Sequence, residues 1–182
     1  MRFTPVRTAV ALAAATLIAT PVAIAGTADR AQAATSTCAV QWGSLEKRGG
    51  TYTTAEFNRV RTGQHACYDR IVIDVSGPKA PGYIVKYVDQ VREDGSGKVV
   101  PVRGGAKLQI VAMTPTMKPV ANKTELADVT GYRTFRQVAY AGSFEGQTTI
   151  GLGVRARLPF KVWTVNSSTG SKLVVDVAHT WS

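Results

Sequence analysis

Short runs in which apolar and polar residues alternate, separated by glycine-rich turns, fill most of the chain from residue 67 onward. In the first of these runs Ile71, Ile73 and Val75 share one face of a strand, and the residues between them share the other. Further strands are expected at residues 83–91, 99–103, 108–112, 136–140, 148–155, 160–165 and 172–178. About seven or eight short strands at spacings near ten residues predict an all-β fold: a single-domain antiparallel β-sandwich or small open barrel.

One segment, residues 114–132, departs from this pattern because it contains two prolines and the polar sequence ANKTELADVTG. Asn122 is a candidate cap for a short helix, with Glu125 three residues later. A surface loop is the alternative.

The first 33 residues have the composition of a secretory signal peptide. Arg2 and Arg7 precede an apolar segment from Thr8 to Ala25, and Ala31-Gln32-Ala33 forms a small-x-small cleavage site. Cleavage after Ala25 and retention of the segment as a membrane anchor are the alternatives. We expect a secreted, cell-wall-associated protein with no lipid anchor and no transmembrane segment in its mature form.

The mature chain divides into an N-terminal arm, residues 34–56, and a β-domain, residues 57–182. The whole chain has a formal charge of +10, and the leader contains three arginines and one aspartate, so its removal leaves +8. Such a charge favours polyanionic partners such as wall polymers, anionic lipid or nucleic acid. The alternative is that the charge only keeps a secreted protein soluble.

Two cysteines, Cys38 and Cys67, remain after the leader is removed. An oxidising destination and an even number of cysteines predict one disulfide, which ties the arm to the first strong strand. Closing a loop of about 30 residues contributes roughly 3–4 kcal/mol in the chain-entropy model. We expect no metal site, since His65 and His179 are the only histidines and show no ligand spacing, and no cofactor.

Catalytic motifs are not evident in the sequence. No G-x-S-x-G motif occurs, and GSFEG at residues 142–146 is predicted to be a turn with Phe144 tucked beneath it. Asp69 and Asp74 are an odd number of residues apart, so in a regular strand they point to opposite faces and cannot act as a carboxylate pair. A secreted small hydrolase or nuclease that uses His65 or His179 is retained as the alternative function.

Aromatic and basic residues interleave between Tyr132 and Tyr140. Such a sheet face can stack sugars while Arg133 and Arg136 hold anions. The alternative is a strand whose aromatic side chains enter the core while its arginines are solvated. Arg155 and Arg157 precede a Leu-Pro-Phe sequence and form a basic turn.

Four stretches resemble the AMIN-like domain of secreted bacterial proteins and lipoproteins, from about Val60 to His179. They are DRIVIDVSGP, GYIVKYVDQVREDGSGKVVPVRGGAKLQI, FRQVAYAGSFEGQTTIGLGVRARLPFKVW and KLVVDVAH. The resemblance implies a compact β-sandwich, a non-catalytic role, and affinity for peptidoglycan or for envelope partners.

Family members often carry VRTGxHxGxDR before the first strand, and here the sequence is VRTGQHACYDR, with Cys67 at the second glycine of that pattern. Arg61, His65, Asp69 and Arg70 fall on this pattern, and Arg136 and Glu145 fall on a later one. These residues form either a binding site or a polar network that holds loops.

The predicted function is a non-enzymatic, envelope-associated binding module whose partner is a cell-wall polymer or an envelope protein, with no specific nucleic acid. We expect a monomer. Addition of a partner strand to an exposed sheet edge is another mode of protein interaction. The candidate binding residues are Arg61, His65, Asp69, Arg70, Arg133, Arg136, Tyr140, Glu145, Arg155 and Arg157.

Overall fold

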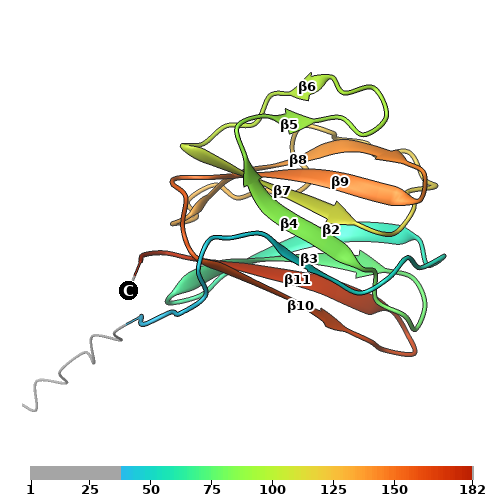
Figure 1. Ribbon diagram of the computed structural model, residues 1–182, viewed down its shortest axis with the longest axis horizontal. Helices are drawn as coiled ribbons and strands as arrows, with labels where there is room; N and C mark the ends of the chain where they lie inside the picture. Colours follow the sequence, from blue (N-terminus) through green and yellow to red (C-terminus); the bar gives the residue numbers. More distant parts are fainter. Residues whose placement is uncertain (1–37, 182) are drawn as a thin grey trace, which may run out of the picture. The chain divides into compact units, whose positions relative to one another are not determined.

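Two antiparallel β-sheets stack face to face in the computed structural model, which describes residues 38–181 (Figure 1). The expected signal peptide lies outside the described residues. The prediction of an all-β antiparallel sandwich is confirmed, and the part of the chain that the structure describes contains no helix. Residues 38–181 therefore also contain no helix long and apolar enough to cross a membrane.

One layer is a five-stranded sheet in the order β1-β4-β7-β9-β8. Its strands are β1 (Lys47–Gly49), β4 (Tyr83–Val88), β7 (Ala106–Ala112), β9 (Gln147–Val154) and β8 (Phe135–Phe144). The other layer is a four-stranded sheet in the order β10-β11-β3-β2. Its strands are β10 (Phe160–Val165), β11 (Ser171–Ala178), β3 (Tyr68–Val75) and β2 (Phe57–Gln64).

The main core lies between these two layers and follows the predicted alternation. Ile71 and Ile73 of β3 and Leu173 of β11 are fully buried against Leu108 of β7 and Ile150 of β9. The inward positions predicted for β3, β7, β9 and β11 are all occupied by core residues. Since successive side chains of a strand alternate between faces, the outward face of each strand is fixed by the same pattern.

A short hairpin, β5 (Val91–Arg92) and β6 (Val99–Val100), covers part of the outward face of the five-stranded sheet (Figure 1). Val91 and Val102 form a second apolar cluster there with Ala139 and Ala141 of β8. Gly151 of β9 permits this approach, because a Cβ at that position would stand 2.9–3.0 Å from the side chains of Val91 and Val102.

The hairpin explains one departure from the predicted strands. The run 83–91 divides into β4 and β5, with a bend at residues 89–90. Val91 belongs to the outer cluster and not to the main core, so the chain must leave the sheet before that residue.

The arm ties both sheets together. The predicted disulfide joins Cys38 to Cys67, directly before β3. Further along, the amide of Phe160 in β10 donates to the carbonyl of Gly43, and β1 then pairs with β4 of the other sheet. Trp42 of the arm packs onto Tyr68, whereas Leu45 is 76% exposed.

Strand β2 is not among the expected strands, because only Phe57 and Val60 in its eight residues turn large apolar side chains toward the core. It is an edge strand that pairs with β3 and contains an irregularity between Phe57 and Arg59. Polar edge strands of this kind carry a weak alternation signal.

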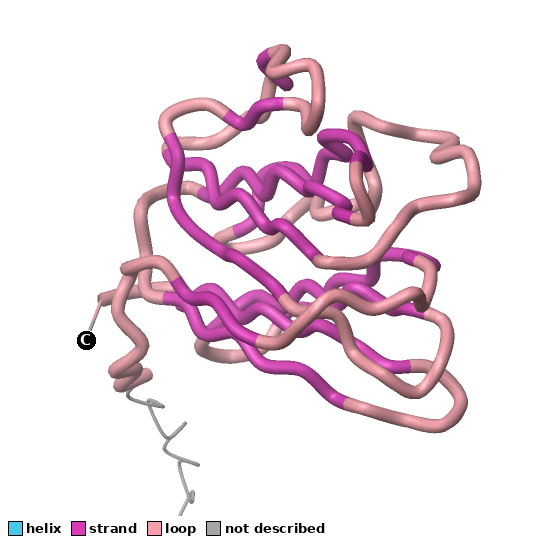
Figure 2. Tube along the Cα trace, turned by 45° about the vertical axis from the view of Figure 1, so that its right-hand side comes forward, coloured by secondary structure: helices cyan, strands magenta, loops and turns pink. Residues whose placement is uncertain are grey.

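Residues 114–132 form loops and turns (Figure 2), so the loop interpretation is correct and the helix is absent from this segment. Asn122 nevertheless acts as a local cap, since its side-chain oxygen accepts from the amides of Thr124 and Glu125. The turn at residues 145–146 is confirmed, with positive φ angles of 48° and 77°, but Phe144 is 51% exposed and lies against Gly95, not beneath the turn.

Candidate binding surface on the four-stranded sheet

The outward face of the four-stranded sheet carries most of its charged residues. The strand register places Lys161 of β10, Asp176 of β11 and Arg70 of β3 in one row across the sheet. A second charged row, four residues along β3, places Asp74 between Lys172 of β11 and Arg59 of β2. We call this surface the cationic face and define it by Arg59, Arg61, Arg70, Lys161 and Lys172.

Asp176 organises the first row. Arg70 donates to both of its carboxylate oxygens, with Nε to Oδ1 at 2.7 Å and Nη2 to Oδ2 at 3.0 Å. The ammonium of Lys161 lies 3.5 Å from Oδ2. The carboxylate is fully buried beneath these two cations, while the side chains of Arg70 and Lys161 remain 29% and 40% exposed. The hydrogen bonds that Arg70 donates to Asp176 raise the pKa of the Arg70 guanidinium.

Asp74 organises the second row. Arg61 donates to its two oxygens at 2.6 and 2.8 Å, and Arg59 donates to Oδ2 at 3.0 Å. These hydrogen bonds hold the pKa of the Asp74 carboxyl below its usual value, and the contribution from Arg61 is the largest. The Asp74 side chain is 12% exposed, whereas those of Arg59 and Arg61 are 66% and 43% exposed.

The face therefore presents positive charge to solvent, with its acids underneath. Five cations over two carboxylates leave a formal surplus of three positive charges. Val72 and Val174 also point outward here, yet they are only 9% and 5% exposed. The register places Arg61 beside Val72 and Trp163 beside Val174 on this face.

Aromatic rings border the first row and are already in contact with its cations. Arg70 lies 5.2 Å from the ring centre of Tyr68 and 5.0 Å from that of Trp163. Lys161 lies 4.7 Å from Trp42 and 4.8 Å from Trp163. These cation–π contacts fix the positions of the two charges.

His65 lies at the margin of this aromatic group. Its ring is exposed and stacks on Tyr68 with a 4.5 Å separation of ring centres. The arrangement matches the sequence pattern, in which His65, Asp69 and Arg70 follow one another closely. Arg70 and Asp69 nevertheless point to opposite faces of β3. The residues of this sequence pattern therefore belong to two different parts of the structure.

Asp69 belongs to a buried polar cluster at the end of the sandwich. Its Oδ2 accepts from the backbone amides of Thr134 and Phe135 at 2.6 and 3.0 Å. The Thr134 hydroxyl lies 2.9 Å from Nδ1 of His179, and Nε2 of His179 donates to the carbonyl of His65 at 3.0 Å. Oδ1 of Asp69 is 3.9 Å from that Nε2 and has no hydrogen bond among the described residues.

A threonine, a histidine and an aspartate thus adjoin, but none is accessible. Asp69 and Thr134 are fully buried and His179 is 3% exposed. Their hydrogen bonds join the start of β3, the start of β8 and the end of β11. The cluster therefore connects the two sheets where these strands begin and end, and a substrate cannot reach it in this arrangement.

Three predicted arginines cap backbone carbonyls near this cluster. Arg136 donates to the carbonyls of Tyr132 and Phe135 at 3.0 and 2.8 Å, Arg155 donates to that of His179, and Arg133 lies 3.4 Å from that of Ala66. The aromatic rings of this segment are in the core, because Phe135 is 1% exposed and stacks with Tyr132 at 5.9 Å. The core interpretation therefore holds for Tyr132 and Phe135, whereas Tyr140 is half-buried outside the core and Arg136 is bound to backbone carbonyls instead of solvated.

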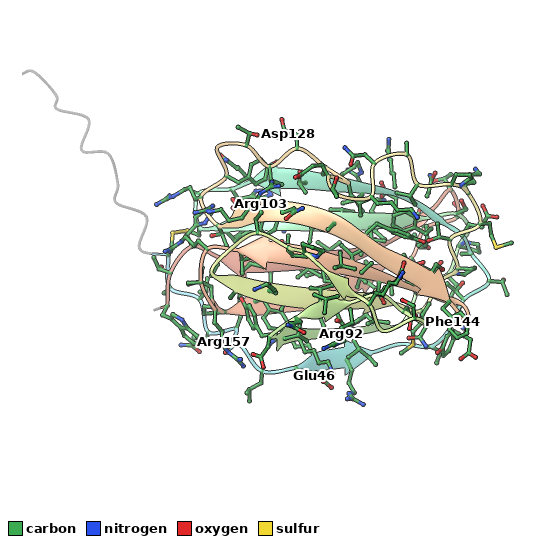
Figure 3. The ribbon with its side chains drawn as sticks, turned by 90° about the horizontal axis from the view of Figure 1, so that it is seen from above. Glu46, Arg92, Arg103, Asp128, Phe144 and Arg157 are labelled. Carbon is green, nitrogen blue, oxygen red and sulfur yellow. A yellow bond between two sulfur atoms is a disulfide. The ribbon has the colours of Figure 1, made fainter. Side chains whose placement is uncertain are left out.

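The remaining predicted residues are dispersed. Arg157 donates to the hydroxyl and the carbonyl of Ser44 in the arm and lies over the Tyr87 ring. Glu145 follows Phe144 in the β8–β9 turn, at the opposite end of β8 from Arg136, and Figure 3 shows Phe144 and Arg157 at opposite ends of the domain. Tyr140 is half-buried on β8 and its amide bonds to the carbonyl of Lys123. Neither Tyr140 nor Glu145 joins the cationic face.

Comparison with known families places this fold. The family described as the AMIN-like domain matches residues 55–179, most of the described chain. This chain belongs to the AMIN-like domain family. No curated protein and no solved structure matches it significantly.

The cationic face of this AMIN-like domain includes residues that sequence reasoning did not select. Arg59, Lys161 and Lys172 were absent from the candidate list, as were Trp163 and Asp176, which contact cations of this face. Alternation alone places Lys161 and Trp163 on one face of β10. Their proximity to Arg70 depends on the order of strands in the sheet, which the sequence does not state.

Metal ligation has no support among residues 38–181, where no group of three or more histidine, cysteine or acidic side chains converges. A depression of about 670 Å³ lies between the 122–132 loop and β8 of the AMIN-like domain. It contains Arg103, which is paired with Glu125 at 2.6 Å, and neither histidine lines it.

Proposed function

We propose that this protein is a secreted, non-catalytic module that binds the cell wall through its cationic face. Membership of the AMIN-like family supports an envelope-associated, cell-wall-related role. The disulfide between Cys38 and Cys67 is consistent with an extracytoplasmic location, since such bonds persist in oxidising compartments. The observation that carries the proposal is the exposed set of cations held over buried carboxylates.

The chemistry of this face suits binding. Arginine and lysine side chains already ordered by Asp74 and Asp176 lose little conformational freedom when they meet an anion. The charges are partly exposed to solvent, so their attraction for an anionic partner weakens as the salt concentration rises. A wall rich in anionic groups is a matching partner.

A non-catalytic role is supported by the surroundings of the two histidines. A general base must reach the proton that it removes, either directly or through a water. His179 is 3% exposed and uses both ring nitrogens within the protein. His65 is exposed but its ring contacts Tyr68, and no described acid lies within ion-pair distance of it.

The test is sedimentation of the mature protein with purified, insoluble cell walls at low and high salt. We expect most of the protein in the pellet at about 20 mM salt and its release at about 1 M, where charges are screened beyond about 3 Å. Protein that remains wholly in the supernatant at low salt contradicts the proposal. Hydrolysis of wall material that is lost when His65 is replaced by alanine would contradict the non-catalytic role.

A further inference from the structure

The spacing of the charges narrows the kind of wall component that the cationic face accepts. Its five cations come from all four strands of the sheet, β10, β11, β3 and β2. Neighbouring strands lie about 4.8 Å apart, and outward residues of one strand repeat about every 6.8 Å. The two charged rows, four residues apart along the strands, are therefore separated by about 14 Å. Arg70 and Lys161 gather over Asp176 in one row, and Arg59 and Arg61 gather over Asp74 in the other.

The aromatic rings offer a second constraint. Stacking of a sugar requires a free ring face, yet Lys161 and Arg70 already lie over Trp163, and the same cations contact Trp42 and Tyr68. The rings therefore position charge on this surface. The recognised group is one that a cation attracts, and a neutral sugar ring does not meet that requirement.

The shape of the surface gives the third constraint. The depression of about 670 Å³ lies elsewhere, between the 122–132 loop and β8. The four strands present a sheet face without that enclosure, and a small monovalent anion held on an open face loses little water and binds weakly. A ligand that contacts several cations at once binds more tightly, because the entropic cost of association is incurred only once for all of the contacts.

We propose that the cationic face binds a linear anionic polymer of the wall, long enough for its phosphate or carboxylate groups to contact both charged rows at once. This inference rests on the proposed function and adds the ligand chemistry and the position of the site. Arg59 and Lys172 flank Asp74 in one row, and Lys161 and Arg70 flank Asp176 in the other.

The variant pair that tests the site compares equal losses of charge on the two sheets. Arg59→Gln with Lys172→Gln removes two cations from the cationic face, and Arg61 still pairs with Asp74. The matched control, Lys86→Gln with Lys98→Gln, removes two exposed cations from β4 and the β5–β6 hairpin on the other side of the sandwich. Both variants have the same net charge, and thermal unfolding checks that each is folded.

Binding is measured by titration with two probes, inorganic polyphosphate and polygalacturonate, at several salt concentrations, with a neutral dextran as reference. We expect the first variant to bind the preferred probe about tenfold more weakly and its salt slope to fall by about 1–2, as for the loss of two phosphate contacts. The control variant should bind nearly as the native protein does. A preference for one probe assigns the phosphate or the carboxylate.

Equal weakening in both variants overturns the inference, because net charge and not this face would then govern binding. No weakening in the first variant overturns it too, because this face would then take no part in binding. Binding to dextran as strong as to the anionic probes overturns it as well. A protein that sediments with walls but binds neither anionic probe retains the proposed function and loses this inference. A protein that does neither loses both.

Discussion

Asp74 shows how one residue combines a structural and a functional role. It is an outward residue of β3, and the sequence alternation predicts both its direction and that of Arg70 on the same face. Its partners Arg59 and Arg61 come from β2, which the alternation does not reveal. The outward direction of Asp74 and Arg70 was therefore predictable from the sequence, whereas the residues that pair with them could be identified only from the strand order.

The depressed pKa of Asp74 predicts a specific acid sensitivity. A carboxyl that is more acidic in the folded protein than in the unfolded chain stabilises the fold above the unfolded value, near 3.8, and this stabilisation is lost as the pH falls through the folded value. Asp74→Asn should lower the free energy of unfolding by about 1 kcal/mol at pH 7, since the arginine partners are half exposed and screened by solvent.

The measurement is the denaturant-unfolding free energy of the native protein and of Asp74→Asn between pH 7 and pH 2. We expect their difference to be constant above about pH 5 and to shrink below 3.8. A difference that stays constant down to pH 2 would show that the carboxyl charge makes no contribution. Asp89→Asn, at an exposed position, serves as the control and should give no such trend.

At the scale of elements, the predicted strands were those whose inward residues are large and apolar. Strands β3, β7, β9 and β11 were expected near their observed positions because each buries several such residues, and β10 was expected from its inward Phe160 and Val162. Strands β1 and β2 were not, because tertiary pairing and not local alternation places them in the sheets. The pairing of Arg70 with Asp176 spans 106 residues, and no local pattern contains it.

The β5–β6 hairpin is an element whose position depends on glycine. A Cβ at Gly153 would stand 1.8 Å from the carbonyl oxygen of Arg103, so Gly153→Ala must displace the segment that follows β6. We expect it to destabilise the domain by about 2 kcal/mol and to increase hydrogen exchange around Val91. Gly63→Ala is the control, since its Cβ would find ordinary contact at 3.8 Å. Equal effects of the two substitutions would mean that the hairpin is not packed here.

At the scale of the whole domain, the disulfide determines how much of the arm is held. It joins Cys38 to Cys67 across 29 residues, and between them the arm contacts β10 through Gly43 and β4 through β1. Replacing both cysteines by serine should lower the free energy of unfolding by about 3 kcal/mol, since the unfolded chain regains the freedom of that loop.

The measurement is denaturant unfolding of the Cys38→Ser/Cys67→Ser variant, followed by tryptophan fluorescence, which also reports the contact of Trp42 with Tyr68. The reduced native protein should behave as the double variant does. If reduction leaves stability unchanged, the arm is held by its backbone pairing alone.

The hairpin over the five-stranded sheet has a consequence for how such a domain would be displayed. One broad side is closed by apolar packing around Gly151, and the opposite side carries the charges of Arg59, Arg61 and Lys172. A domain with a single binding side lies on its ligand in one orientation. The β5–β6 hairpin would then face away from the wall and be the first part that an approaching protein contacts.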